Sequence, residues 1–179
     1  MVKAAYSAGK PALGVGPGNV PAFIERTANI PKAVNNIIAS KTFDNGTICA
    51  SEQAVIVEAC VRDRVIAEFK RQGGYFMTPA ETEIVAKKLF ANGHAMNAKM
   101  VGRSAEVIAG NAGIAIPPGT KVLLGEQQGI GEGYPLSYEK LTTVLAFYTV
   151  QNWQEACDLS ISLLNNGGVG HSMSIHTEN

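Results

Sequence analysis

The chain has 179 residues, of which 46% are hydrophobic and only 17% are charged. So much apolar side chain can offset the entropy lost on folding, which excludes a disordered polar tail and predicts one folded domain. Fifteen basic and fifteen acidic residues cancel, so the chain carries no long-range attraction to nucleic acid or to an anionic membrane. No stretch approaches the length of a membrane span and the N-terminus has no signal-peptide pattern, so we expect a cytoplasmic protein.

Cysteine and histidine usage argues against disulfides and metals. Cys49, Cys60 and Cys157 are an odd number of cysteines, widely spaced and without a CxxC pair. The three histidines have neither the HExxH nor the CxxC…HxxxH spacing of a zinc site. We therefore expect neither a disulfide framework nor a bound metal.

The first predicted elements are a short strand and a capped helix. A turn rich in glycine and proline begins at Leu13 and leads into the strand Ala22–Ile24. Asn29 is a suitable N-cap, and Pro31 fits the first helical turn, where its missing N–H would have no intrahelical partner. The helix keeps its apolar residues on one face and is expected to end before Asp44.

Helices and strands alternate along the rest of the chain. A buried strand is predicted over Gln53–Glu58 and a helix over Arg62–Gln72. Thr78 and Glu81 have the spacing of a capping box, which predicts a helix up to Asn92. The remaining predictions are the helices Ala105–Gly110 and Trp153–Asn165 and the strands Lys121–Leu124, Leu145–Val150 and Ser172–Ile175. Strands separated by helices are typical of βαβ units, so we predict an α/β fold with a mainly parallel sheet and flanking helices.

Cys49 lies between the end of a predicted helix and the start of a buried strand. Loops of this kind hold side chains accessible on a fixed scaffold, so Cys49 is a candidate nucleophile once it is deprotonated. The alternative is a cysteine that packs as a small hydrophobe, which is how this residue type usually behaves. Cys60 and Cys157 lie at the edges of elements beside apolar neighbours, and we assign both to packing.

Three further features have both a functional and a simple interpretation. The segment Gly14–Asn19 suggests a phosphate-binding loop, but it lacks the GxGxxG spacing, and its glycines more simply let two backbones approach closely. Glu139 is by default a surface charge. His171 follows the glycine-rich segment Gly167–Gly170 at the start of a predicted strand, and is by default a satisfied or exposed histidine.

The segment Lys41–Gln53, KTFDNGTICASEQ, resembles the active-site cysteine segment of the CoA-dependent, acylating aldehyde dehydrogenases. That family includes the aldehyde half of bifunctional aldehyde–alcohol dehydrogenases and the aldehyde dehydrogenases of bacterial microcompartments. The resemblance continues through Pro11–Pro21 and Ile30–Val57 and returns at Tyr138–Leu141 and Gly167–Ser172, so it covers essentially the whole chain in the right order.

The resemblance implies a role for four residues. Cys49 matches the catalytic thiol, and His171 matches a histidine that lines the acyl-transfer site. Glu139 matches the glutamate that binds the nicotinamide ribose hydroxyls. Val15 stands where hydrolytic aldehyde dehydrogenases have a glutamate general base, and since valine cannot activate water, the acyl group is expected to pass to CoA.

The resemblance also implies a fold, a domain and a set of partners. Residues 1–179 are expected to form the thiol-bearing catalytic domain of the family, without its N-terminal nucleotide-binding domain, and to be inactive in isolation. NAD is the implied cofactor, CoA the co-substrate and a short aldehyde the substrate, in the cytoplasm or in a bacterial microcompartment. The complete enzyme is expected to be a homo-oligomer.

Two other functions stay open at this stage. The chain could be a non-catalytic interaction or oligomerisation domain of such an enzyme. A phosphate-binding protein would need a helix N-terminus after Gly18, and Pro21 with the strand that follows argues against one.

Overall fold

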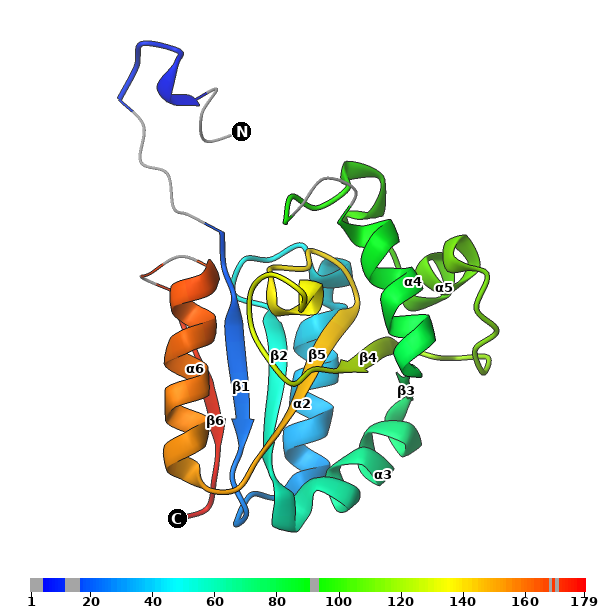
Figure 1. The fold of residues 1–179 in the computed structure, drawn as a ribbon, viewed down its shortest axis with the longest axis vertical. Helices are drawn as coiled ribbons and strands as arrows, with labels where there is room; N and C mark the ends of the chain where they lie inside the picture. Colours follow the sequence, from blue (N-terminus) through cyan, green and yellow to red (C-terminus); the bar gives the residue numbers. More distant parts are fainter. Residues whose placement is uncertain (1–4, 12–16, 91–93, 168, 170) are drawn as a thin grey trace.

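The computed structural model describes residues 5–11, 17–90, 94–167, 169 and 171–179. Their centre is a six-stranded sheet in the order β3-β4-β5-β2-β1-β6, in which each strand is parallel to its neighbours (Figure 1). The strands are β1 (Val20–Ile24), β2 (Glu52–Glu58), β3 (Gly74–Phe76), β4 (Val122–Glu126), β5 (Val144–Val150) and β6 (Ser174–His176). The predicted α/β class with a parallel sheet is confirmed.

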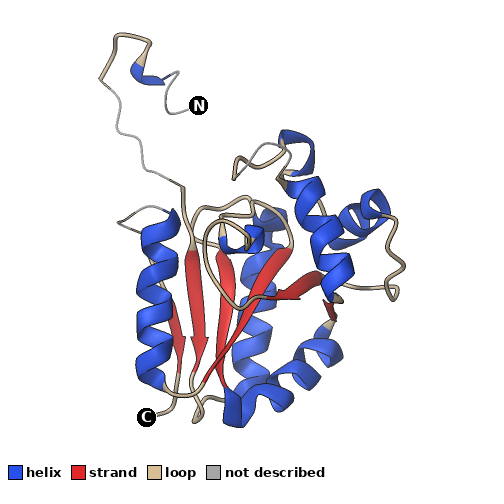
Figure 2. Ribbon diagram, in the orientation of Figure 1, coloured by secondary structure: helices blue, strands red, loops and turns tan. Residues whose placement is uncertain are grey.

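Helices cover both faces of the sheet (Figure 2). Alternate residues of a strand point to opposite faces, so in β2 Val55 and Val57 pack into one apolar cluster, and Ala54 and Ile56 into the other. The first cluster contains α2 (Ile30–Thr42) and α3 (Arg62–Gln72); the second contains α4 (Pro79–Leu89), α5 (Ala105–Ala112) and α6 (Trp153–Gly167). Within the described ranges, no helix is both long and apolar enough to cross a membrane.

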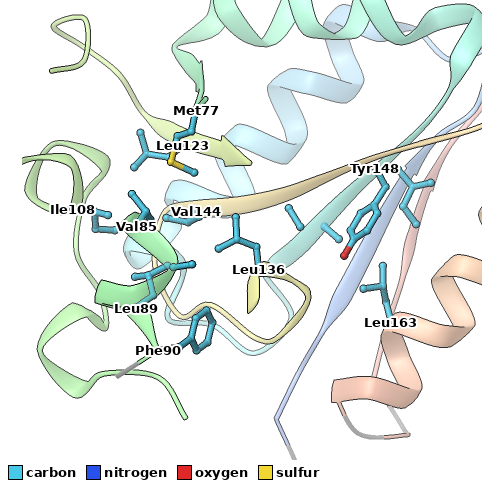
Figure 3. Packing of buried hydrophobic residues seen from close by; sticks show 14 of the residues in the cluster. Met77, Val85, Leu89, Phe90, Ile108, Leu123, Leu136, Val144, Tyr148 and Leu163 are labelled. Atoms are coloured by element: carbon cyan, nitrogen blue, oxygen red, sulfur yellow. The ribbon is translucent and has the colours of Figure 1, made fainter. Parts of the chain in front are cut away.

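The cluster on the α4 side is shown in Figure 3. Val85 of α4 and Ile108 of α5 lie beside Leu123 of β4, and all three are buried. Leu136, from the loop between β4 and β5, is fully buried in the same cluster. Since Leu136 comes shortly before Glu139, the apolar core anchors the loop that carries this candidate site residue.

The predicted helix ends have the expected chemistry. The side chain of Asn29 accepts a hydrogen bond from the N–H of Lys32, which caps α2. Thr78 and Glu81 exchange both hydrogen bonds of a capping box at the start of α4. At the end of α3, Gly73 is left-handed, with φ of 102°, a conformation that glycine adopts without strain.

Three sequence predictions need correction. Strand β3 was not expected, because it has three residues and begins with the second glycine of the pair that ends α3. Cys60, assigned to packing, is exposed: the turn Ala59–Val61 after β2 buries only Val61. The last helix ends at Gly167, close to its predicted end, whereas the last strand begins two residues later than predicted and spans Ser174–His176.

The topology brings four separate loops to one edge of the sheet. Residues that precede parallel strands lie at the same, amino-terminal edge. Gly18 precedes β1, Cys49 precedes β2, Glu139 precedes β5 and His171 precedes β6. These four strands are adjacent in the order β5-β2-β1-β6, so segments more than a hundred residues apart in sequence become neighbours.

Candidate active site

Gly18 is the point at which the candidate residues meet. Its N–H donates a 2.8 Å hydrogen bond to Glu139 Oε1. A Cβ added to Gly18 would lie 2.2 Å from the carbonyl oxygen of Cys49 and 2.9 Å from His171 Nε2. Only a residue without a side chain fits between these groups, which confirms the expectation that glycine here allows close approach. The structure therefore brings Cys49, Glu139 and His171 around one backbone position.

Cys49 is exposed and lies at the end of a tightly held loop. Asp44 and Asn45 have φ values of 47° and 48°, and Gly46 has 75°, so three consecutive residues are left-handed. Asparagine and aspartate tolerate this conformation better than other residues with a side chain. Asn45 Nδ2 donates to the carbonyl of Gly102, and a Cβ on Gly46 would lie 2.6 Å from the Thr142 carbonyl oxygen. The loop is thus held against Gly102 and Thr142.

Glu139 is a half-buried carboxylate at the amino end of β5. Burial raises its pKa above the ordinary value, while the N–H of Gly18 and the positive charges of His171, Lys41 and Lys140 act in the opposite direction. Oε1 is bonded to Gly18. A carboxylate oxygen has more than one lone pair, so the group retains acceptor capacity for hydroxyl donors.

His171 is partly buried, with its ring against Gly18. Its Nδ1 is buried and has no hydrogen-bond partner among the described residues. A neutral imidazole donates from one nitrogen and accepts at the other, so this ring keeps the capacity to move a proton.

A buried polar network that the sequence did not single out lies behind the site. Lys41, at the end of α2, and Lys140, next to Glu139, are both fully buried. Lys41 Nζ donates to Gln53 Oε1 at 3.2 Å and to the Lys140 carbonyl at 3.0 Å. Lys140 Nζ donates to the carbonyls of Leu136 and Tyr138. The helical periodicity of α2 could have predicted the burial of Lys41, because Val34, Ile38 and Lys41 lie on the same buried face of this helix.

Two features bear on the site less directly. Val15 lies outside the described residues, together with Gly14 and Gly16, so the predicted replacement of a general base by valine has no geometry here. A cavity of about 670 Å³ lies between α4 and the segments that follow β3 and β4. Its lining includes Met77, Phe90 and Tyr134 but none of the candidate site residues, so it is separate from the meeting point at Gly18.

No family model matches the chain. It is 46% identical over 178 residues to the aldehyde-alcohol dehydrogenase of Clostridium acetobutylicum, an alignment that covers 99% of this chain and 20% of that protein. The crystal structure of an acetylating aldehyde dehydrogenase from Geobacillus thermoglucosidasius superposes with a TM-score of 0.93 at 53% identity, over 99% of this chain and 39% of that one. Over 99% of its length, the chain is similar to part of these acylating aldehyde dehydrogenases. The resemblance inferred from the Cys49 segment is confirmed.

One further structure is informative about chemistry in this family. A propionaldehyde dehydrogenase from Rhodopseudomonas palustris, solved with bound CoA and an acylated cysteine, superposes with a TM-score of 0.87 at 29% identity, over 99% of this chain and 40% of that one. The chain therefore spans about two fifths of the single-function relatives and about a fifth of the bifunctional ones.

Proposed function

We propose that this chain forms the thiol-bearing catalytic domain of an enzyme that interconverts a short aldehyde and its acyl-CoA, with Cys49 as nucleophile. The observation that carries the proposal is the meeting of Cys49, Glu139 and His171 around Gly18. The similarity to acylating aldehyde dehydrogenases supports this reaction class, and the exposed thiol of Cys49 is consistent with a nucleophile.

Cys49 carries the acyl group in this proposal. Its thiolate adds to the aldehyde carbonyl, and backbone N–H groups near Cys49 stabilise the oxyanion that forms. Loss of hydride from this adduct leaves a thioester on Cys49, which the CoA thiolate attacks. A new carbon–sulfur bond to CoA forms as the bond to Cys49 breaks, so the Cys49 thiolate is regenerated without net hydrolysis.

Glu139 and His171 have supporting roles. The half-buried carboxylate of Glu139 suits the two hydroxyl donors of a nicotinamide ribose, and the bound nicotinamide would supply the hydride acceptor. NAD is the proposed nicotinamide cofactor. His171, with its partly buried ring beside the carbonyl of Cys49, accepts the proton of the attacking CoA thiol.

The other expectations stand as parts of the same proposal. Val15 in place of a general base disfavours hydrolysis of the thioester. We also propose a cytoplasmic or microcompartment enzyme that is a homo-oligomer when complete.

The reverse acyl step tests the proposal without a nicotinamide cofactor, so it does not require the complete aldehyde oxidation that the isolated chain is expected to lack. Incubation of the chain with acetyl-CoA is expected to transfer one acetyl group to Cys49 and release free CoA, which peptide mass spectrometry and a thiol assay detect. Cys60 provides the matched control, because it is also exposed but has no candidate residues around it. Cys49→Ala should abolish the transfer and Cys60→Ala should leave it unchanged.

Two results would overturn the assignment. Acetylation of Cys60 at a rate equal to that of Cys49 would mean that the reaction reports exposure alone. An unmodified Cys49 in a folded chain, after prolonged incubation, would favour the alternative of a non-catalytic interaction domain.

A further inference from the structure

Gln53 is bonded to both loops that carry candidate site residues. Its Nε2 donates to the carbonyl of Ser51, two positions after Cys49, at 3.2 Å. Its Oε1 accepts the backbone N–H of Lys140, the residue after Glu139, at 2.8 Å. A single buried amide therefore links the loop of the thiol to the loop of the carboxylate.

Lys41 completes this link from the helix layer. Its ammonium bonds the same Gln53 Oε1 and also the carbonyl of Lys140, so Lys140 is held through both its N–H and its C=O. Helix α2 itself packs in the core through Val34 and Ile37, which are fully buried. The lysine thus ties two loops at the sheet edge to a rigid helix.

Placing Lys41 there is energetically costly. Burial lowers its pKa to about 7, although the carboxylates of Glu52 and Glu139 favour the charged form. The charged groups around Lys41 are these two carboxylates and Lys140. Burial, together with the neighbouring Lys41, lowers the pKa of Lys140 well below its ordinary value. A methionine would fill similar volume without this cost, so packing alone does not account for a lysine at this position.

We propose that Lys41 is a positioning residue, which fixes the carboxylate of Glu139 relative to Cys49 by clamping the two loops through Gln53. The consequence for catalysis rests on the proposed function, whereas the clamp is a property of the fold. Lys41 has no direct chemical role, because its side chain is fully buried and its ammonium is bonded to Gln53 and Lys140.

The hydrogen bond from Gly18 to Glu139 reports on the clamp. In Lys41→Met, the Glu139 loop loses one attachment, and exchange of the Gly18 amide hydrogen, followed by NMR in the whole chain, should become about tenfold faster. The amides of Val55 and Val57, in the centre of β2, should exchange within about twofold of the original rate. Lys32→Met is the matched control, since Lys32 lies on the same helix but is exposed, and it should change neither rate.

A second variant guards against a failure of Lys41→Met to fold. Gln53→Leu breaks the clamp from the other side and should give the same local increase at Gly18. Unchanged exchange at Gly18 in the folded variants would overturn the proposal. Equal acceleration at Gly18, Val55 and Val57 would also overturn it, because that pattern indicates general loss of stability.

The acetyl-CoA reaction separates this inference from the proposed function. If the unmodified chain does not acetylate Cys49, the proposed function fails while the exchange result still decides the clamp. If it does, the control Lys32→Met should acetylate Cys49 within about twofold of the original rate, because Lys32 is exposed and lies outside the clamp.

Discussion

The two ends of strand β2 hold buried charge in different ways. At the carboxyl end, the fully buried side chain of Glu58 is paired with Arg26, which donates from its backbone N–H and its guanidinium. At the amino end, the ammonium groups of Lys41 and Lys140 hydrogen-bond to uncharged oxygens. In the first arrangement, the positive charge of Arg26 compensates the buried carboxylate of Glu58. In the second, the buried ammonium groups are bonded to uncharged oxygens, so the energetic cost of burying their charge remains. Sites that depart from the most stable solution are where function is expected, and the candidate residues gather at the amino end.

The largest effect is expected from filling the space at Gly18. In Gly18→Ala, the new methyl group would overlap the carbonyl of Cys49 and the ring of His171, so one or both must move. A displacement of about 1 Å at a reacting group can cost roughly 100-fold in rate, which is the loss we expect in acetylation of Cys49 by acetyl-CoA. The rate measured by mass spectrometry checks this. A rate equal to that of the unmodified chain would show that the amino end tolerates displacement and does not form a site.

At the carboxyl end we expect a change in stability and none in acyl transfer. Arg26→Ala leaves the fully buried carboxylate of Glu58 without its charged partner, which should lower the free energy of unfolding by clearly more than the loss of an exposed ion pair. Urea unfolding measures this. Lys87→Ala, which removes an ion pair between two exposed side chains, serves as control and should leave the free energy of unfolding close to that of the unmodified chain. If Arg26→Ala instead slowed acetylation of Cys49 in the folded chain, the proposed separation between the two ends would be wrong.

Some features of the fold and of the candidate site can be predicted from the sequence, and others cannot. Helix caps at Asn29 and Thr78 and the α/β class follow from spacing along the chain, and the motif around Cys49 indicated the family. The clamp did not follow, because Lys41, Gln53 and Lys140 come together only through strand order and helix packing. The exposure of Cys60 was missed for a related reason: which residue of a short turn faces the core depends on the direction in which the chain leaves the strand.

Lys41 should make the stability of the amino end depend on pH. Its folded pKa of about 7 lies below the ordinary value of 10.5, so between these values the unfolded chain binds a proton that the folded chain has released. The contribution of Lys41 to stability therefore rises with pH through this window, by about 1.4 kcal/mol per unit, and is constant below pH 7, where both states are protonated. Urea unfolding of the unmodified chain and of Lys41→Met, from pH 6 to pH 9, gives the difference. A difference independent of pH would mean that Lys41 stays charged in the folded state.

The smallest expected effect compares the two exposed thiols that flank β2. Cys49 precedes the strand, and its carbonyl oxygen and the ring of His171 both lie against Gly18, whereas Cys60 follows the strand, near the guanidinium of Arg26. That guanidinium is already bonded to Glu58, so the pair offers Cys60 little net positive charge. An imidazole next to a thiol can accept its proton and assist the nucleophile.

We therefore expect iodoacetamide to alkylate Cys49 about fivefold faster than Cys60 near neutral pH, with the rates read from the two labelled peptides. His171→Ala should reduce the ratio towards one without changing the rate at Cys60. Faster labelling of Cys60 in the folded chain would remove the physical support for Cys49 as the nucleophile.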